Sequence, residues 1–225
     1  SLLGGEMTDD EWRSCLFQII MMLVTYQKMF DFTHNDLHTN NIMYNTTEQQ
    51  FIIYKYNGVF YRVPTYGKLF KIIDFGRAIY KFNGKTICSD SFHSKGDAAT
   101  QYNCEPYINS KKPRIEPNPS FDLCRLACSL YDQFDERLGD LFDTNPIAQL
   151  IVAWCIDDKG RNVLYKKCGE ERYPDFKLYK MIARSVNHHK PSKYVTHDVF
   201  SRYVSNRKKC KRKKAMNIDV LPCYV

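Results

Sequence analysis

The sequence lacks the long apolar stretch that a membrane-spanning helix requires. Its longest strongly apolar run, Cys15 to Val24, already includes a glutamine, and it is too short to cross a bilayer, which takes about 20 apolar residues. No amino-terminal segment joins a basic region, an apolar stretch and a small-residue cleavage site, so a secretory signal is not indicated. We expect an intracellular protein with no membrane partner.

Paired cysteine motifs are also lacking, although cysteine itself is not scarce. The nine cysteines are scattered and no two of them form a CxxC pair, so neither a zinc ribbon nor a redox dithiol is indicated. Cys124 and Cys128 lie one helical turn apart in an apolar stretch, where buried thiols are the simpler interpretation. Scattered, unpaired cysteines of this kind are typical of a reduced, intracellular protein.

Excess positive charge is lacking from most of the chain. The net charge is +8, but seven basic residues lie in the single run 207–214, which contains no acid, and the rest of the chain is close to neutral. We therefore predict a folded domain over 1–204 and a basic tail over 205–225. A solvated tail is the simplest interpretation, because no aromatic residues are interleaved for stacking on bases; nucleic-acid binding or nuclear import is the alternative.

The first third of the chain carries one strong helix signal and two strand signals. Thr8 and Glu11 form a capping box, and apolar residues then recur at helical spacing as far as Phe30, which predicts a buried helix. Residues 51–63 are rich in β-branched and aromatic residues on both sides of Asn57-Gly58, a strong hairpin signal. Residues 69–73 predict a further strand.

The remainder of the chain is predicted to be mostly helical, which gives an α+β class. No sustained period is present from 74 to 119, so we expect a long loop there. Four helices are expected. The first spans 121–134, the second starts at Asn145-Pro146, and the third runs from Pro174 to near Asn187. The fourth starts after Thr196, a candidate cap.

Two short motifs carry the residue types that phosphoryl transfer needs. One group must accept or orient the proton of the attacking hydroxyl, and another must hold a metal ion on the same loop. Asp36 and Asn41, five residues apart, supply a carboxylate and an amide. Asp74 follows an apolar strand and precedes Phe75 and Gly76, which adds a metal ligand where the backbone must turn sharply.

Together the two motifs resemble the carboxy-terminal, catalytic lobe of the protein-kinase superfamily, over about Thr8 to Asn187. The long hairpin and the phrase Asn-Pro-Ser-Phe-Asp-Leu-Cys-Arg-Leu-Ala over 118–127 are most similar to divergent serine/threonine kinases of large DNA viruses. The resemblance implies a mostly helical kinase lobe with a β-hairpin inserted between the catalytic loop and Asp74-Phe75-Gly76. A viral origin would place the protein in the host cell or the virion.

The resemblance also implies a role for each site residue. It makes Asp36 the catalytic base, with His38 and Asn41 as the other catalytic residues, and it makes Asn41 and Asp74 ligands of Mg²⁺. Asn41, Asp74, Phe75 and Gly76 would form the nucleotide-binding set, with His34 as a packing residue and Asp122 as the buried aspartate that supports the catalytic loop. His38 is equally well explained as a plain loop residue.

Two residues depart from the pattern of regulated protein kinases. Asn35 stands where those kinases have an arginine that pairs with an activation-loop phosphate, so we do not expect control by loop phosphorylation; Arg77 is the obvious substitute. His38 replaces the usual lysine, as in haspin-like kinases and aminoglycoside phosphotransferases, and Asn35 is similar to choline kinases. A small-molecule kinase is therefore an alternative, although Asp74-Phe75-Gly76 and the long segment after it favour a protein substrate.

A Gly-rich loop and a strand-borne lysine, which grip ATP in kinases, are not found before Thr8. We expect the ATP-gripping lobe to come in cis or from another chain, and a non-catalytic scaffold is the second alternative. The expected activity of the parent protein is transfer from ATP, with Mg²⁺, to a serine or threonine hydroxyl of a protein. The fragment alone is expected to be inactive.

Overall fold

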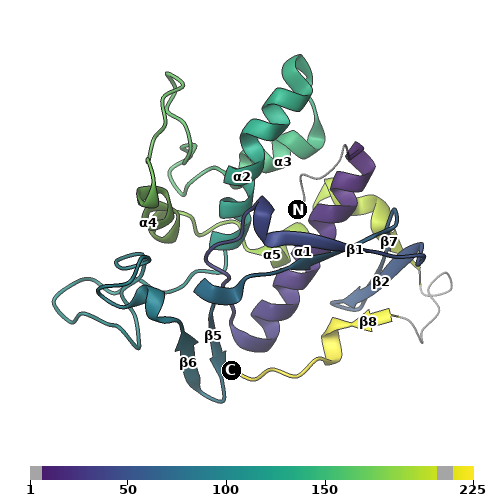
Figure 1. Ribbon diagram of the computed structural model, residues 1–225. Helices are drawn as coiled ribbons and strands as arrows, with labels where there is room; N and C mark the ends of the chain where they lie inside the picture. Colours follow the sequence, from purple (N-terminus) through teal and green to yellow (C-terminus); the bar gives the residue numbers. More distant parts are fainter. Residues whose placement is uncertain (1–6, 207–214) are drawn as a thin grey trace.

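The computed structural model describes residues 7–206 and 215–225, and Figure 1 shows their arrangement. In the view of Figure 1, helix α1 lies near the centre, with β2, β7 and β8 to its right, α4 and the β5–β6 pair to its left, and α2 and α3 above it. The helices are α1 (Asp9–Phe30), α2 (Phe121–Leu138), α3 (Pro146–Trp154), α4 (Phe176–Ser185) and α5 (Pro191–Tyr194). The strands are β1 (Ile42–Thr46), β2 (Phe51–Tyr56), β3 (Val59–Pro64), β4 (Lys68–Ile72), β5 (Ile79–Phe82), β6 (Lys85–Cys88), β7 (Val204–Ser205) and β8 (Ala215–Asn217).

Helix α1 begins at the predicted capping box. The Glu11 carboxylate accepts the Thr8 N–H at 2.9 Å, and the Thr8 hydroxyl accepts the Glu11 N–H at 3.3 Å. The helix ends at Asp31, whose left-handed φ of 47° breaks the helical backbone. Its central turns are buried, and the ring of Phe17 packs against Phe200 and Tyr203 from the end of the chain. The prediction of a buried first helix is confirmed.

The Asn57-Gly58 hairpin is also confirmed. Strands β2 and β3 pair antiparallel up to Tyr56 opposite Val59, and both turn residues have positive φ, 49° at Asn57 and 75° at Gly58. Glycine adopts this conformation without strain, and asparagine tolerates it. The hairpin forms the middle of a four-stranded sheet of order β7-β3-β2-β8.

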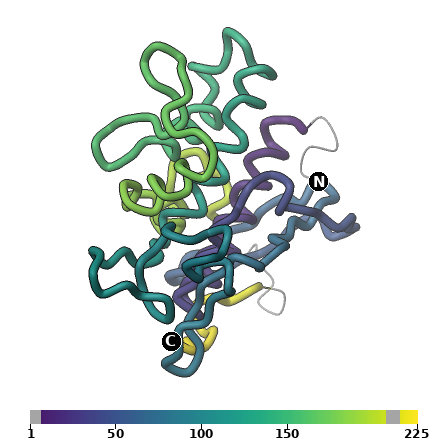
Figure 2. The backbone as a smooth tube through the Cα atoms, turned by 60° about the vertical axis from the view of Figure 1, so that its left-hand side comes forward, coloured from purple at the N-terminus to yellow at the C-terminus, as the bar shows by residue number. Residues whose placement is uncertain are grey.

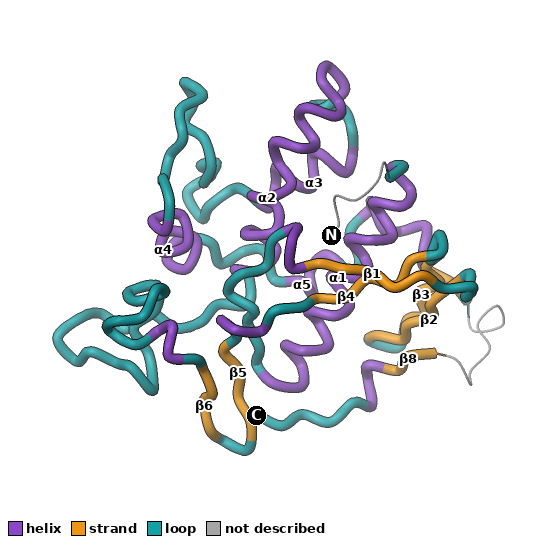
Figure 3. Tube along the Cα trace, viewed as in Figure 1, coloured by secondary structure: helices purple, strands orange, loops and turns teal. Residues whose placement is uncertain are grey.

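A second hairpin was missed by the sequence analysis. Strands β5 and β6 pair antiparallel around Asn83-Gly84, within the stretch 74–119 that was expected to be one loop. The turn residues again have positive φ, 50° and 74°. The same Asn-Gly signal was therefore present, but the flanking strands are short and their side chains are only partly buried. Residues 93–120 do form a long loop, which lies on the α4 side of the molecule (Figure 3).

The helices of the second half lie close to their predicted positions. Asn145 caps α3, its side-chain oxygen accepting the N–H groups of Ile147 and Ala148, as expected for Asn before a first-turn proline. The expectation for Thr196 is wrong. His197 is the residue before the short 3₁₀ segment Asp198–Tyr203, and its Nδ1 accepts the Val199 N–H at 3.3 Å.

The predicted tail divides into two parts. The basic run 207–214 lies outside the described residues. Residues 215–225 pack against the domain: β8 pairs parallel with β2, Ile218 is fully buried, and the ring of Tyr224 stacks on Phe30 at 5.3 Å. The backbone carbonyl of Tyr224 also accepts the Asn83 N–H at 2.8 Å, so the end of the chain lies beside the β5–β6 turn (Figure 2).

The architecture is α+β, with helices and small sheets around one core, in agreement with the predicted mixed class. The finer expectation of a kinase catalytic lobe stays a prediction, as does the boundary between domain and tail. In residues 7–206 and 215–225, no helix combines the length and the hydropathy needed to cross a membrane.

Candidate functional site

The loop between α1 and β1, which carries Asp36, is supported from below by α2. The Asp122 carboxylate, fully buried near the start of α2, accepts the backbone N–H groups of His34 and Asn35, each at 2.9 Å. Burial raises the pKa of Asp122, while the neighbouring His34 and the two N–H donors act in the opposite direction. Further along, the Ser129 hydroxyl accepts the Thr39 N–H at 3.1 Å. The supporting contact predicted for Asp122 is present.

His34 and Asn35 join this loop to the segment around Asp74. His34 Nε2 lies 2.9 Å from the carbonyl oxygen of Ile73. The Asn35 side chain donates to the carbonyl of Arg77 at 3.0 Å and accepts from the Tyr102 hydroxyl at 2.6 Å. Asn35 is fully buried with a left-handed φ of 63°. Asn35 therefore acts as an internal cross-link between the two segments.

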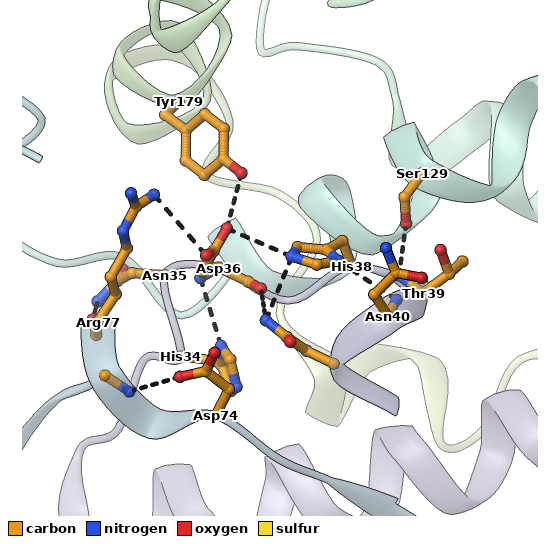
Figure 4. Close-up of polar contacts among 12 residues, drawn as sticks. His34, Asn35, Asp36, His38, Thr39, Asn40, Asp74, Arg77, Ser129 and Tyr179 are labelled. Carbon is orange, nitrogen blue, oxygen red and sulfur yellow. Dashed lines mark hydrogen bonds and ion pairs between the residues drawn. The ribbon is translucent and has the colours of Figure 1, made fainter. Parts of the chain in front are cut away.

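Three side chains from different segments converge on the Asp36 carboxylate (Figure 4). The Tyr179 hydroxyl, from α4, donates to Oδ1 at 2.7 Å. Arg77 Nη1 lies 3.7 Å from Oδ2, and His38 Nε2 lies 3.9 Å from Oδ1. The Asp36 side chain is partly buried, with 22% of its surface exposed. The carboxylate is thus surrounded by donors while remaining accessible from one side.

Asn41 is fixed next to the predicted base. Its Nδ2 donates to the backbone oxygen of Asp36 at 2.9 Å and lies 3.3 Å from His38 Nε2. Partial burial and the charge of Arg125 lower the pKa of His38, which favours the neutral imidazole at neutral pH. Because the amide nitrogen is engaged on the loop, the amide oxygen is the group that Asn41 can offer to a ligand.

Asp74 is linked to Asn41 through one backbone bond and the β1–β4 pairing. The Ile73 N–H donates to the Asn41 carbonyl at 3.0 Å, and Ile42 pairs with Ile72. Asp74 has a left-handed backbone, φ 61°, and its Oδ1 accepts the Gly76 N–H at 3.2 Å. A Cβ on Gly76 would lie 3.1 Å from the same oxygen, a tight contact that explains the glycine.

Phe75 points into an aromatic group next to the loop. Its ring contacts Tyr26, Phe32 and His34, with centroid separations of 6.1, 5.9 and 5.5 Å. Even so, 45% of its surface is exposed. An aromatic side chain that is packed on one face and exposed on the other leaves apolar area available at the rim of the site.

Asp74 and Asn41 carry oxygen atoms of the kind that bind a magnesium ion. A carboxylate and an amide oxygen are hard ligands of the type Mg²⁺ prefers. Within the described ranges, no group of three or more His, Cys, Asp or Glu residues could hold a metal without help. Mg²⁺ usually takes one or two carboxylates and completes its shell with substrate phosphates and water, so two protein ligands are sufficient.

The structure thus brings the predicted residues Asp36, His38 and Asn41 together and ties Asp74 to them; their chemical roles stay predictions. Two contributors were not predicted. Tyr179 is 143 residues from Asp36 in the sequence, and no local pattern marks it. Arg125, on α2, lies over the Tyr179 ring at 4.9 Å. Arg77 was named only as a substitute for the missing arginine.

Comparison with known proteins gives a weak kinase-like signal. Over 103 residues, 43% of this chain, it is 31% identical to a probable serine/threonine-protein kinase of Dictyostelium discoideum. Over 179 residues, 77% of this chain, it is 31% identical to an uncharacterized protein of Invertebrate iridescent virus 6. The matched stretches cover only 8% and 26% of those proteins. No protein-family model matches the chain. The chain is therefore similar, at a distance, to a protein named as a kinase and to a viral protein.

Proposed function

We propose that this chain supplies the catalytic-loop half of an ATP-dependent phosphotransferase, a serine/threonine protein kinase. One observation carries the proposal: Asp36 and Asn41 lie on a single supported loop, and the backbone bond from Ile73 to Asn41 ties Asp74 to that loop. Both catalytic requirements, a base for the hydroxyl and ligands for the metal, then lie on rigid neighbouring elements.

Asp36 acts on the acceptor. A general base must lie within about 2.6–3.2 Å of the group whose proton it takes. The Tyr179 hydroxyl, held at 2.7 Å from Oδ1, demonstrates that an O–H group can approach this carboxylate at that distance. Asp36 orients the incoming serine or threonine hydroxyl toward the phosphorus and receives its proton. Arg77, at 3.7 Å from Oδ2, would add positive charge beside the base during transfer.

Asp74 and Asn41 would hold Mg²⁺, which neutralises charge on the ATP phosphates when it is bound. The Gly76 N–H donates to Asp74 Oδ1 at 3.2 Å and restrains the carboxylate, and the lack of a Cβ leaves room for that contact. Because Asn41 Nδ2 donates to the backbone oxygen of Asp36, the amide oxygen is the atom that would bind the metal.

The ATP-gripping lobe is proposed to come from sequence in cis or from a second chain. No Gly-rich loop or paired strand lysine stands before Thr8 in the sequence, and the chain spans only a small share of the proteins it matches. We therefore expect the 225-residue chain alone to bind ATP weakly and to transfer no phosphate.

The test uses the longest reading frame that encodes this chain. The purified protein is incubated with γ-labelled ATP and Mg²⁺, together with a general protein acceptor, choline or an aminoglycoside in separate reactions. We expect label on serine or threonine of the protein acceptor, and none with Asp36→Asn. Asp132→Asn is the matched control, because Asp132 also accepts a tyrosine hydroxyl at 2.7 Å but lies on the exposed side of α2. Transfer only to choline or an aminoglycoside would favour a small-molecule kinase, and no transfer to any acceptor would favour a scaffold.

A further inference from the structure

The catalytic loop lacks the two cations that usually flank a kinase base, since the neighbouring residues are Asn35 and His38. The surroundings of Asp36 are supplied instead from distant parts of the chain. The closest contact is the hydroxyl of Tyr179, 2.7 Å from Oδ1, on helix α4. Figure 4 shows this side chain descending from α4 onto the carboxylate.

We propose that Tyr179 is the positioning residue of Asp36: its hydroxyl holds the carboxylate in the orientation in which the base receives the acceptor hydroxyl. This inference rests on the proposed phosphotransfer activity. It assigns to α4, a helix outside both recognised motifs, a direct part in the geometry of the site.

The Tyr179 ring is itself held on several sides. Phe176 stacks on it with 5.2 Å between the centroids, and Phe121 packs at 6.2 Å. The guanidinium groups of Arg125 and Arg77 lie 4.9 and 5.7 Å from the ring centroid. A side chain restrained in this way loses little further entropy when its hydroxyl binds Asp36, so the hydrogen bond can fix the carboxylate rotamer.

The phenol also keeps its proton. Burial is the largest influence on Tyr179 and raises its pKa; the hydrogen bond to Asp36 acts in the same direction, and Arg125 acts against both. A protonated hydroxyl donates to Oδ1 throughout the neutral range. The remaining lone pairs of the carboxylate stay available for the acceptor.

A different role, in which Tyr179 is the phosphate acceptor, fits the surroundings less well. In-line transfer requires the attacking hydroxyl oxygen to align with the phosphorus atom and the leaving oxygen. Phe176 and Arg125 restrain the Tyr179 ring, and its hydroxyl is already bound to the base. A held donor of this kind is suited to orienting Asp36.

The experiment compares Tyr179→Phe with Tyr165→Phe in the full reading frame. The two tyrosines are matched, because the Tyr165 hydroxyl donates to Asp132, also at 2.7 Å, away from the site. Each replacement keeps the ring and removes only the hydroxyl. Turnover, the KM for ATP, the melting temperature and phosphate content by mass spectrometry are measured for both variants and the wild type.

Loss of a hydrogen bond to a charged group predicts that Tyr179→Phe lowers kcat about 10- to 100-fold. The KM for ATP is expected to stay unchanged and the melting temperature to fall no further than that of Tyr165→Phe, which should keep the wild-type kcat. The inference is overturned if Tyr179→Phe retains kcat, if kcat falls only in step with the melting temperature, or if phosphate is found on Tyr179. In each of these cases the wild type still transfers phosphate, so the proposed function stands. An inactive wild type would instead refute the proposed function and the inference with it.

Discussion

The guanidinium of Arg77 lies beside the carboxylate of Asp36, with 3.7 Å between Nη1 and Oδ2. Its Nη2 is bound to Asp97 at 2.6 Å, and this contact lowers the pKa of Asp97. Asp97 thus places a fixed negative charge on Arg77, where regulated kinases place a phosphate on their activation loop. Arg77 is thus paired with carboxylates of the chain itself.

We therefore predict that activity does not depend on phosphorylation between Asp74 and Glu105. The measurement is the rate of the phosphatase-treated full reading frame, with and without alanine at Thr86, Ser89, Ser91, Ser94 and Thr100. Unchanged rates are expected, because Arg77 is already paired. A large loss that acidic replacements restore would show that a phosphate is required.

Asp122 is predicted to be the main support of the loop that carries Asp36. Asp122→Ala removes the acceptor of two buried N–H groups, His34 and Asn35. Because each unsatisfied buried donor costs about 1–3 kcal/mol, we expect the free energy of unfolding in urea to fall by about 2–6 kcal/mol. Asp140→Ala, at an exposed position after α2, is the control. Equal small losses in both variants would argue against the supporting role.

The carboxy-terminal segment is predicted to stabilise the domain. Ile218 is fully buried, whereas 72% of the Val220 surface is exposed. Truncating a buried isoleucine to alanine typically costs about 2–5 kcal/mol, so Ile218→Ala should lower the free energy of unfolding far more than Val220→Ala. If the two losses are alike, residues 215–225 do not pack on the body in solution.

Features that depend on a few adjacent residues could be predicted from the sequence. Caps and tight turns depend on a few adjacent residues, and Thr8 with Glu11, Asn57-Gly58 and Asn145-Pro146 were interpreted correctly. The Asn83-Gly84 hairpin carried the same local signal, but it lay in a segment interpreted as loop because its strands are short. His197 displaced Thr196 as a cap because either side chain can accept an N–H group.

The surroundings of Asp36 depend on tertiary packing, which leaves no local pattern. Tyr179 reaches Asp36 only because α4 packs against α2, and its spacing from the loop carries no signal. The loop residues themselves could be identified, since Asp36 and Asn41 are close in sequence and must share one turn. Their chemical roles are proposed from the resemblance of the two motifs to protein kinases.

Stability should fall on acidification partly because of His189. This buried imidazole lies 2.7 Å from the Tyr194 hydroxyl through Nδ1 and 2.7 Å from the Ile156 carbonyl through Nε2. Nε2 donates to the carbonyl, and in the neutral ring Nδ1 accepts from the Tyr194 hydroxyl. Burial is the main reason that the pKa of His189 is lowered from its ordinary value of 6.5.

A lowered folded-state pKa means that the folded form binds the proton less readily than the unfolded form. The contribution of His189 is therefore complete above pH 6.5 and is lost as the pH falls from there toward the folded pKa. We expect His189→Gln to flatten the decline in unfolding free energy between pH 7 and pH 5 in urea titrations. His93→Gln, at an exposed site, should retain the wild-type slope. If unfolding free energy falls with pH equally in His189→Gln and the wild type, His189 is not a source of the acid-induced loss of stability.

The central claim is that Asp74 binds Mg²⁺ and that Asp36 is the base, and comparing variants of the two residues tests it most directly. The measurement is Mg²⁺-dependent ATP affinity by calorimetry, together with turnover, for Asp74→Ala and Asp36→Ala in the full reading frame. Because Asp74 is the proposed metal ligand and Asp36 the base, Asp74→Ala should lose both the Mg²⁺-dependent affinity and turnover. Asp36→Ala should lose turnover while binding ATP as the wild type does. Equal loss of ATP binding in both variants, or retained turnover in both, would contradict the account.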